Sequence, residues 1–263
     1  MEVERGALGR YPFAAVGAGE PVVVLAGLSP VTGVEGGITV RSAVGPFAPL
    51  AGRRRLVVLN RRSHLPRGMT MAELASEHAE AIAAGLGGAV DVIGVSTGGS
   101  IAQQLAADHP GAVRRLVLVS TACRLGPEGR RAQRQVAARI RARAYRRALV
   151  VMGADLVPPR RGRIAAGAVA WLAGPLVVRD RHGLDDMATT IEAEDEFDLA
   201  DCRAPIEAPT LIVAGSDDRF YGRDLFEETA RLIPGAQLRV LDGRGHVTVM
   251  RDPRLRRALT ELL

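Results

Sequence analysis

Residues 90–99 place a serine where it could act as a nucleophile. The segment reads Val-Asp-Val-Ile-Gly-Val-Ser-Thr-Gly-Gly, so Ser96 has a glycine two residues away on either side, Gly94 and Gly98. An apolar, β-branched run precedes the serine, and a stretch with helical periodicity, residues 100–108, follows it. A strand, a sharp turn and a helix in this order form a nucleophile elbow, where the serine takes a positive φ and only near-hydrogen side chains fit two positions away. We predict that Ser96 is a catalytic nucleophile held at such a turn.

A serine hydroxyl needs a base to accept its proton, and the base needs a third group to orient it. Two predicted strands downstream, residues 210–214 and 237–241, are each followed by a suitable group: Asp217 and Asp218 after the first, His246 after the second. Catalytic groups of open α/β sheets gather at the carboxyl ends of the strands. We predict that His246 is the base. We favour Asp218 over Asp217 as its partner, because a loop can turn Asp218 inward.

The other histidines fit the role of base less well. His64 stands in a polar loop after a strand, where it could line the entrance to the site. His78 lies inside a predicted helix, His109 at a helix end before a proline, and His182 in a helical region. We interpret all four as surface or packing histidines.

Acyl transfer also requires two backbone N–H groups aimed at the oxygen that becomes negatively charged. Thr97 follows the predicted nucleophile at the start of a helix and would supply one of them. The loop after the first buried strand would supply the other, and Leu28 is the candidate, because Gly27 lets the chain approach the substrate closely. Taken alone, residues 27–30 could equally be an ordinary turn at a strand end.

The rest of the chain alternates between short apolar runs and helical patterns. Besides the run before Ser96, buried strands are predicted at residues 21–26, 55–60, 116–120, 210–214 and 237–241. Thr70 and Glu73 form a capping-box pattern that starts a helix reaching about residue 83, and residues 253–263 form a final helix. This alternation predicts an α/β fold: a mostly parallel central sheet with helices on both faces.

The alternation stops between residues 124 and 200, which are mostly helical in pattern. Breaks fall at Gly153, Pro158-Pro159, Gly174-Pro175 and Gly183. Since the sheet pattern resumes afterwards without a linker, we predict a helical cap, residues 123–202, inserted into one core made of residues 1–122 and 203–263.

Together, these segments resemble the α/β-hydrolase family. The resemblance rests on the strand ending in Ala26-Gly27-Leu28, the elbow around Ser96, Gly215 with Asp218, and Gly245-His246. It implies that Ser96 is the nucleophile, His246 the general base and acid, and Asp218 its orienting partner. Many members carry a histidine where this chain has Ala26, and the branches that use an aspartate nucleophile do not match.

Composition excludes several other classes of protein. The chain of 263 residues has a net charge of +6, and all 35 of its basic residues are arginine. Without a nucleic-acid module or interleaved aromatic residues, we expect no nucleic-acid binding. The two cysteines suggest neither a disulfide framework nor a metal site, and we expect no cofactor. The apolar runs are too short for a membrane span, and no signal peptide is apparent, so a cytoplasmic location is expected.

The leading functional hypothesis is a serine hydrolase that cleaves a carboxylic ester, lactone or thioester of a small-molecule acyl substrate through an acyl-enzyme. Alternatives are carbon–carbon bond hydrolysis, perhydrolysis or acyl transfer on the same fold, or a ligand-binding protein without catalysis.

Residues 128–147 are rich in arginine, and residues 192–201 are rich in acids. At helical spacing, Val136, Ile140 and Ala144 share a stripe, which predicts one amphipathic helix whose arginines face water. These arginines could simply solubilise the cap, or they could attract an anionic substrate or an acidic carrier protein.

Overall fold

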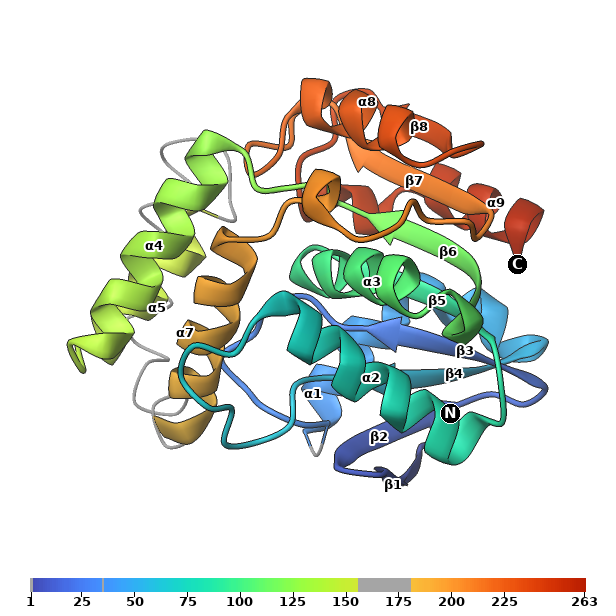
Figure 1. Cartoon of the computed structure of the whole chain (residues 1–263), viewed down its shortest axis with the longest axis horizontal. Coiled ribbons are helices and arrows are strands. Elements are labelled where there is room, and N and C mark those ends of the chain that lie inside the picture. Colours follow the sequence, from blue (N-terminus) through green and yellow to red (C-terminus); the bar gives the residue numbers. More distant parts are fainter. Residues whose placement is uncertain (1, 35, 156–180) are drawn as a thin grey trace.

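Eight strands form one sheet at the centre of the computed structural model, which describes residues 2–34, 36–155 and 181–263 (Figure 1). The order across the sheet is β1-β2-β4-β3-β5-β6-β7-β8. The strands β4-β3-β5-β6-β7-β8 run parallel to one another, and β1 and β2 add an antiparallel hairpin beside β4. The bounds are β1 (Glu4–Leu8), β2 (Tyr11–Val16), β3 (Glu20–Leu25), β4 (Arg54–Leu59), β5 (Val90–Val95), β6 (Val113–Val119), β7 (Thr210–Gly215) and β8 (Gln237–Leu241).

Helices cover both faces of the sheet. The α-helices are α1 (Gly37–Val44), α2 (Met71–Leu86), α3 (Thr97–Asp108), α4 (Pro127–Arg141), α5 (Tyr145–Asp155), α7 (Arg181–Asp195), α8 (Arg223–Leu232) and α9 (Pro253–Leu262). Short 3₁₀ helices are η1 (Gly45–Gly52), η2 (Pro110–Ala112), η3 (Leu199–Asp201) and η4 (Thr248–Arg251). Helices α2, α3 and α8 pack on one face, and α1, η1 and α9 on the other (Figure 1).

Alternation along the strands divides the core into these two layers. In β3, Val23 and Leu25 pack with α2 and α3, whereas Val22 and Val24 pack with α1 and α9. Successive side chains of a strand point to opposite faces, so a strand that is apolar at every position is suited to burial on both sides, as in residues 22–25 of β3. The predicted α/β fold with a mostly parallel sheet is therefore confirmed.

The predicted capping box starts α2. The Thr70 side chain accepts a hydrogen bond from the backbone N–H of Glu73, and the Glu73 carboxylate accepts one from the backbone N–H of Thr70. The helix continues beyond the predicted end to Leu86, and Gly87 closes it with φ 73°.

Helices α4, α5 and α7, here called the inserted helices, lie between β6 and β7 in the chain. They gather beyond the carboxyl ends of the strands (Figure 1) around a small apolar cluster of their own. The single helix predicted over residues 128–147 is wrong: Arg143 takes φ 59°, and the chain turns between α4 and α5. Val136 and Ile140 are buried on α4, whereas Ala144 lies in the turn.

Residues 156–180, predicted to be mostly helical, lie outside the described residues, and so do the breaks at Pro158-Pro159 and Gly174-Pro175. The domain boundaries at residues 122/123 and 202/203 stay a prediction. In the described part of the chain, no helix is long and apolar enough to cross a membrane.

Candidate active site

Ser96 lies at a sharp turn between β5 and α3, with φ 51° and ψ −125°. A side chain at Gly98 could not fit, because a Cβ there would lie 2.3 Å from the carbonyl oxygen of Leu25. A Cβ at Gly94 would lie 2.6 Å from Cα of Gly99. Both glycines therefore serve the predicted steric role, and the turn holds Ser96 in a conformation that is costly for a residue with a side chain.

Three side chains from separate loops meet at this turn. Ser96 Oγ lies 3.0 Å from His246 Nε2, and His246 Nδ1 lies 2.8 Å from Asp218 Oδ2. With its proton on Nδ1, His246 donates to Asp218 and accepts the serine hydrogen bond. The neighbouring Asp217 is exposed, and its carboxylate accepts a hydrogen bond from Ser216 instead. The structure thus places Asp218, and not Asp217, beside the histidine.

Buried contacts hold the acid and the histidine in place. The Asp218 side chain has no exposed surface, and its Oδ1 accepts a hydrogen bond from the backbone N–H of Phe220 at 2.9 Å. The Phe220 ring lies against the imidazole, with a centroid distance of 4.7 Å. Ser120, at the end of β6, donates from Oγ to the carbonyl oxygen of His246 at 2.8 Å. These contacts leave His246 little freedom to turn away from Ser96.

Ser120 was missed by the sequence analysis, which placed it only at the end of a strand. Its φ is 51°, and its backbone N–H donates to the carbonyl oxygen of Val213 on the neighbouring strand. A positive φ is uncommon for serine, and unlike Ser96, Ser120 has no glycine two residues away on either side that would indicate it in the sequence. The contact joins residues far apart in the chain, so a local pattern could not reveal it.

The two predicted oxyanion donors flank the serine. Thr97 is the first residue of α3, and Leu28 lies in the loop after β3 and lines the cavity over Ser96. A Cβ at Gly27 would lie 3.5 Å from Cβ of Ser96, so this loop does approach the serine closely. Within the described residues, neither N–H makes another backbone hydrogen bond. Their role as oxyanion donors stays a prediction.

A cavity of about 400 Å³ opens over Ser96 and His246. Its walls come from the core loops and from the inserted helices, and they include Leu28, Val136, Met152, Ile191, Phe220 and Met250. Among the described residues that line it, His246 is the only titratable one. The cavity therefore favours an uncharged, largely apolar group beside the serine.

The other histidines do not join this group. His78 is buried, which lowers its pKa, and its Nδ1 lies 2.7 Å from the carbonyl oxygen of Leu74. His109 Nε2 lies 3.0 Å from the hydroxyl of Ser76. His64 and His182 are exposed, and their rings lie against each other, tilted by 57°, with a centroid distance of 4.7 Å. The described part of the chain holds no group of three or more His, Cys, Asp or Glu residues suited to a metal ion.

The model of the α/β-hydrolase family matches residues 22–258. RutD of Klebsiella pneumoniae, provisionally named a carbamate hydrolase, is 29% identical over 194 residues, which are 72% of this chain and 70% of RutD.

Two solved structures have a similar fold. One is the enol-lactonase from Burkholderia xenovorans LB400, with a TM-score of 0.76 and 19% identity over 98% of this chain and 99% of the lactonase. The other is a hydrolase from Pseudomonas aeruginosa PA01, with a TM-score of 0.73 and 24% identity over 99% of this chain and 98% of that protein.

Proposed function

Because the chain belongs to the α/β-hydrolase family, we propose that it is a serine hydrolase that cleaves a carboxylic ester, lactone or thioester through an acyl-enzyme on Ser96. One observation carries the proposal: Ser96, His246 and Asp218 form a hydrogen-bonded series, with distances of 3.0 and 2.8 Å, beneath an apolar cavity. A hydroxyl, a base and an orienting carboxylate in this order are the parts that nucleophilic acyl transfer needs.

In the proposed mechanism, His246 Nε2 takes the proton of Ser96 Oγ as the oxygen attacks the substrate carbonyl. The carbonyl oxygen becomes negatively charged, and the backbone N–H groups of Leu28 and Thr97 stabilise it. His246 then passes its proton to the leaving group, which departs and leaves the acyl group on Ser96. A water molecule, deprotonated by His246, attacks the acyl-enzyme; as the bond to Ser96 Oγ breaks, His246 returns the proton to that oxygen and the acid is released. Asp218 remains a carboxylate that holds the imidazole and stabilises its positive charge.

The cavity supports an uncharged acyl group of moderate size as substrate. Its described walls are mainly aliphatic side chains, from Leu28 on the core to Val136 and Ile191 on the inserted helices. A charged group placed among them would lose its hydration without gaining a partner of opposite charge. A carbamate, as the provisional name of RutD suggests for that relative, would be attacked by the same serine and belongs in the substrate panel.

A fluorophosphonate probe tests the proposal, because it forms a covalent bond only with an activated serine. Intact-mass measurement should show one phosphonyl adduct on the native protein and none on Ser96→Ala. Hydrolysis of a p-nitrophenyl ester should fall by about 10⁴-fold or more in the same variant. A native protein that neither reacts with the probe nor cleaves any ester or carbamate would support ligand binding without catalysis. A protein that reacts with the probe but cleaves esters only slowly would favour carbon–carbon hydrolysis or acyl transfer.

A further inference from the structure

Glu194, near the end of α7, is fully buried next to the proposed nucleophile. Its side chain accepts four hydrogen bonds: from the Thr97 hydroxyl at 2.7 Å, the Ser100 hydroxyl at 2.8 Å, the Gln133 amide at 2.9 Å and the Tyr221 hydroxyl at 3.2 Å. All four donors are uncharged. Among the described residues, no cation forms an ion pair with Glu194, and burying a carboxylate without such a partner is costly.

Two of these donors belong to the first turn of α3. Thr97 directly follows Ser96, and its backbone N–H is one of the two proposed oxyanion donors. Ser100 lies three residues further along the same turn, and its backbone N–H donates to the carbonyl oxygen of Ser96. The Glu194 carboxylate therefore binds the side chains of Thr97 and Ser100, and so holds the short segment that orients the proposed oxyanion N–H.

The other two donors connect this turn with the rest of the site. Gln133 comes from α4 and lines the cavity above Ser96. Tyr221 stacks on His246 with a centroid distance of 5.9 Å, and its burial next to Glu194 raises the pKa of its hydroxyl well above the usual value. Through one side chain, the inserted helices are thus joined to the elbow and to the loop that carries the acid.

We propose that Glu194 is a positioning residue, which fixes the first turn of α3 so that the Thr97 N–H points at the developing oxyanion. This inference rests on the proposed function. Oxyanion stabilisation depends on donors held at a defined place before the reaction begins. Thr97 presents only its backbone to the reacting atoms, and its side chain, turned toward Glu194, keeps that backbone from shifting.

The test measures phosphonylation of Ser96 together with ester hydrolysis. Glu194→Ala removes all four hydrogen bonds and should lower both kcat and the phosphonylation rate constant roughly 10–100-fold, with KM changed by less than about twofold, because only the transition state is affected. Glu194→Gln should recover most of the rate. Its new amide can pair with Gln133 Oε1, which is buried and has no partner among the described residues.

Asp186 offers a matched control on the same helix. It is also buried, and its carboxylate accepts hydrogen bonds from the backbone N–H groups of His64 and Leu65, which belong to the loop between β4 and α2 and not to the elbow. Asp186→Ala should lower the melting temperature as Glu194→Ala does, but leave the phosphonylation rate within about twofold. Equal losses of rate in the two variants would mean that Glu194 acts only through stability, and the inference would fail.

A milder variant covers the case in which Glu194→Ala does not fold. Thr97→Val is nearly isosteric and removes one hydrogen bond, so kcat should fall about tenfold at unchanged KM; Thr97→Ser should restore it. If the native protein reacts with the probe and Thr97→Val reacts equally fast, the inference is overturned while the proposed function stands. If the native protein does not react at all, the proposed function itself has failed.

Discussion

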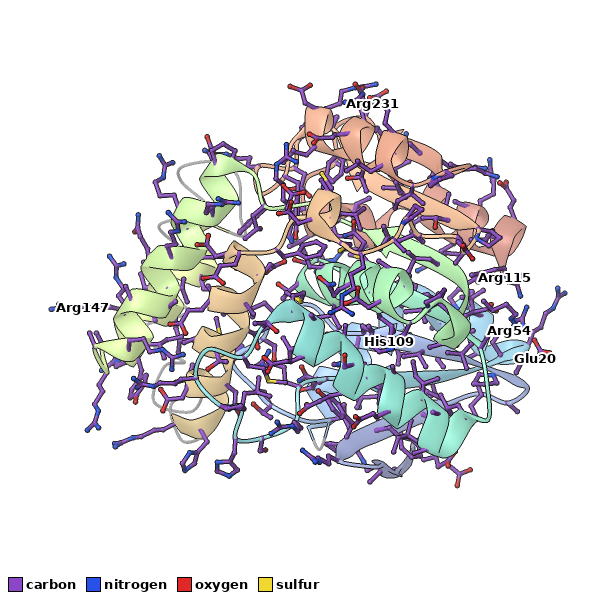
Figure 2. All side chains as sticks on the ribbon, in the orientation of Figure 1. Glu20, Arg54, His109, Arg115, Arg147 and Arg231 are labelled. Atoms are coloured by element: carbon purple, nitrogen blue, oxygen red, sulfur yellow. The ribbon has the colours of Figure 1, made fainter. Side chains whose placement is uncertain are left out.

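Asp91 and Asp218 are buried aspartates at opposite ends of the strands of the sheet: Asp91 lies at the amino end and Asp218 at the carboxyl end. The groups that bind them differ in kind. Asp91, at the start of β5, is bound by the guanidinium groups of Arg114 and Arg115, each as close as 2.9 Å. Asp218, beyond the end of β7, is bound by an imidazole and a backbone N–H. Figure 2 shows Arg115 at the end of the molecule farthest from the inserted helices.

The kind of partner indicates whether a buried aspartate serves the stability of the fold or the proposed reaction. A guanidinium keeps its charge at every accessible pH, so the pairing of Asp91 is permanent and can only hold the strands together. An imidazole can gain and lose a proton within one catalytic cycle, and the carboxylate beside it responds to that change. Glu194, with four uncharged donors, belongs with Asp218 in this respect.

The largest expected effect is on kcat, when Asp218 at the carboxyl end of the strands is replaced. Asp218→Asn should lower kcat by about 10⁴-fold, because the amide favours the wrong imidazole tautomer and cannot stabilise the imidazolium. Asp217→Asn, one residue away and exposed, should change kcat by less than about twofold. Ester hydrolysis by the two purified variants decides between them. Equal or reversed effects would assign the acid to Asp217.

Asp91→Asn should show the opposite behaviour: lower stability with unchanged kcat. We expect the free energy of unfolding at neutral pH to fall by about 2 kcal/mol. That is less than for a fully buried pair, because the side chains of Arg114 and Arg115 are 38% and 26% exposed. Urea unfolding measures the first quantity and ester hydrolysis the second. A large loss of kcat without a loss of stability would contradict the interpretation that Asp91 serves stability and Asp218 serves the reaction.

The pH dependence of this effect has a definite sign. Burial raises the pKa of Asp91, but the hydrogen bonds from Arg114 and Arg115 outweigh it and bring the pKa below the ordinary 3.8. The carboxylate therefore stabilises the fold fully above that ordinary value, and the contribution is lost as the pH falls through the lowered one. The stability difference between the native protein and Asp91→Asn should shrink under acidic conditions and stay constant near neutrality.

The smallest expected effect concerns the arginines of α4. Arg134 binds Asp195 at 2.7 Å and Arg141 binds Glu192, so these cations already have acidic partners on α7. Arg147 on α5 points outward, away from the sheet (Figure 2). We expect kcat/KM for a neutral and an anionic ester to keep the same ratio, within about twofold, between low and high salt. A steep fall for the anionic ester alone would instead support attraction of anionic substrates or an acidic carrier protein.

The sequence predicted those parts of the site whose requirements are local. The glycines beside Ser96 are needed because backbone atoms lie within 3 Å of the position that a Cβ would take, and the five residues from Gly94 to Gly98 are enough to show this constraint in the sequence. Asp218 and His246 each follow an apolar strand, so their meeting follows from the parallel sheet. Ser120 and Glu194 meet their partners only through tertiary contacts, and no spacing in the chain marks them.

The same distinction explains the errors in the fold. Strands β1 and β2 were both missed. Four of the five residues of β1 are exposed, and β2 includes a proline, which is unusual within strands, and joins the sheet by pairing with the distant β4. The predicted stripe on residues 128–147 failed at Arg143, where arginine adopts a conformation more usual for glycine or asparagine. In both cases, long-range packing overrode the preference of the local sequence.

The two buried acids of α7 have a consequence for protein engineering. Asp186 and Glu194 are eight residues apart, a little over two helical turns, and each fastens α7 to a different part of the core. A designer who exchanges the inserted helices for those of a relative, to alter which acyl groups enter, would need to carry over both anchors with their spacing. Residues of α4 and α5 that only line the cavity could be varied more freely. A library with both residues held constant should then yield altered specificity, with Asp186 preserving stability and Glu194 preserving the catalytic geometry.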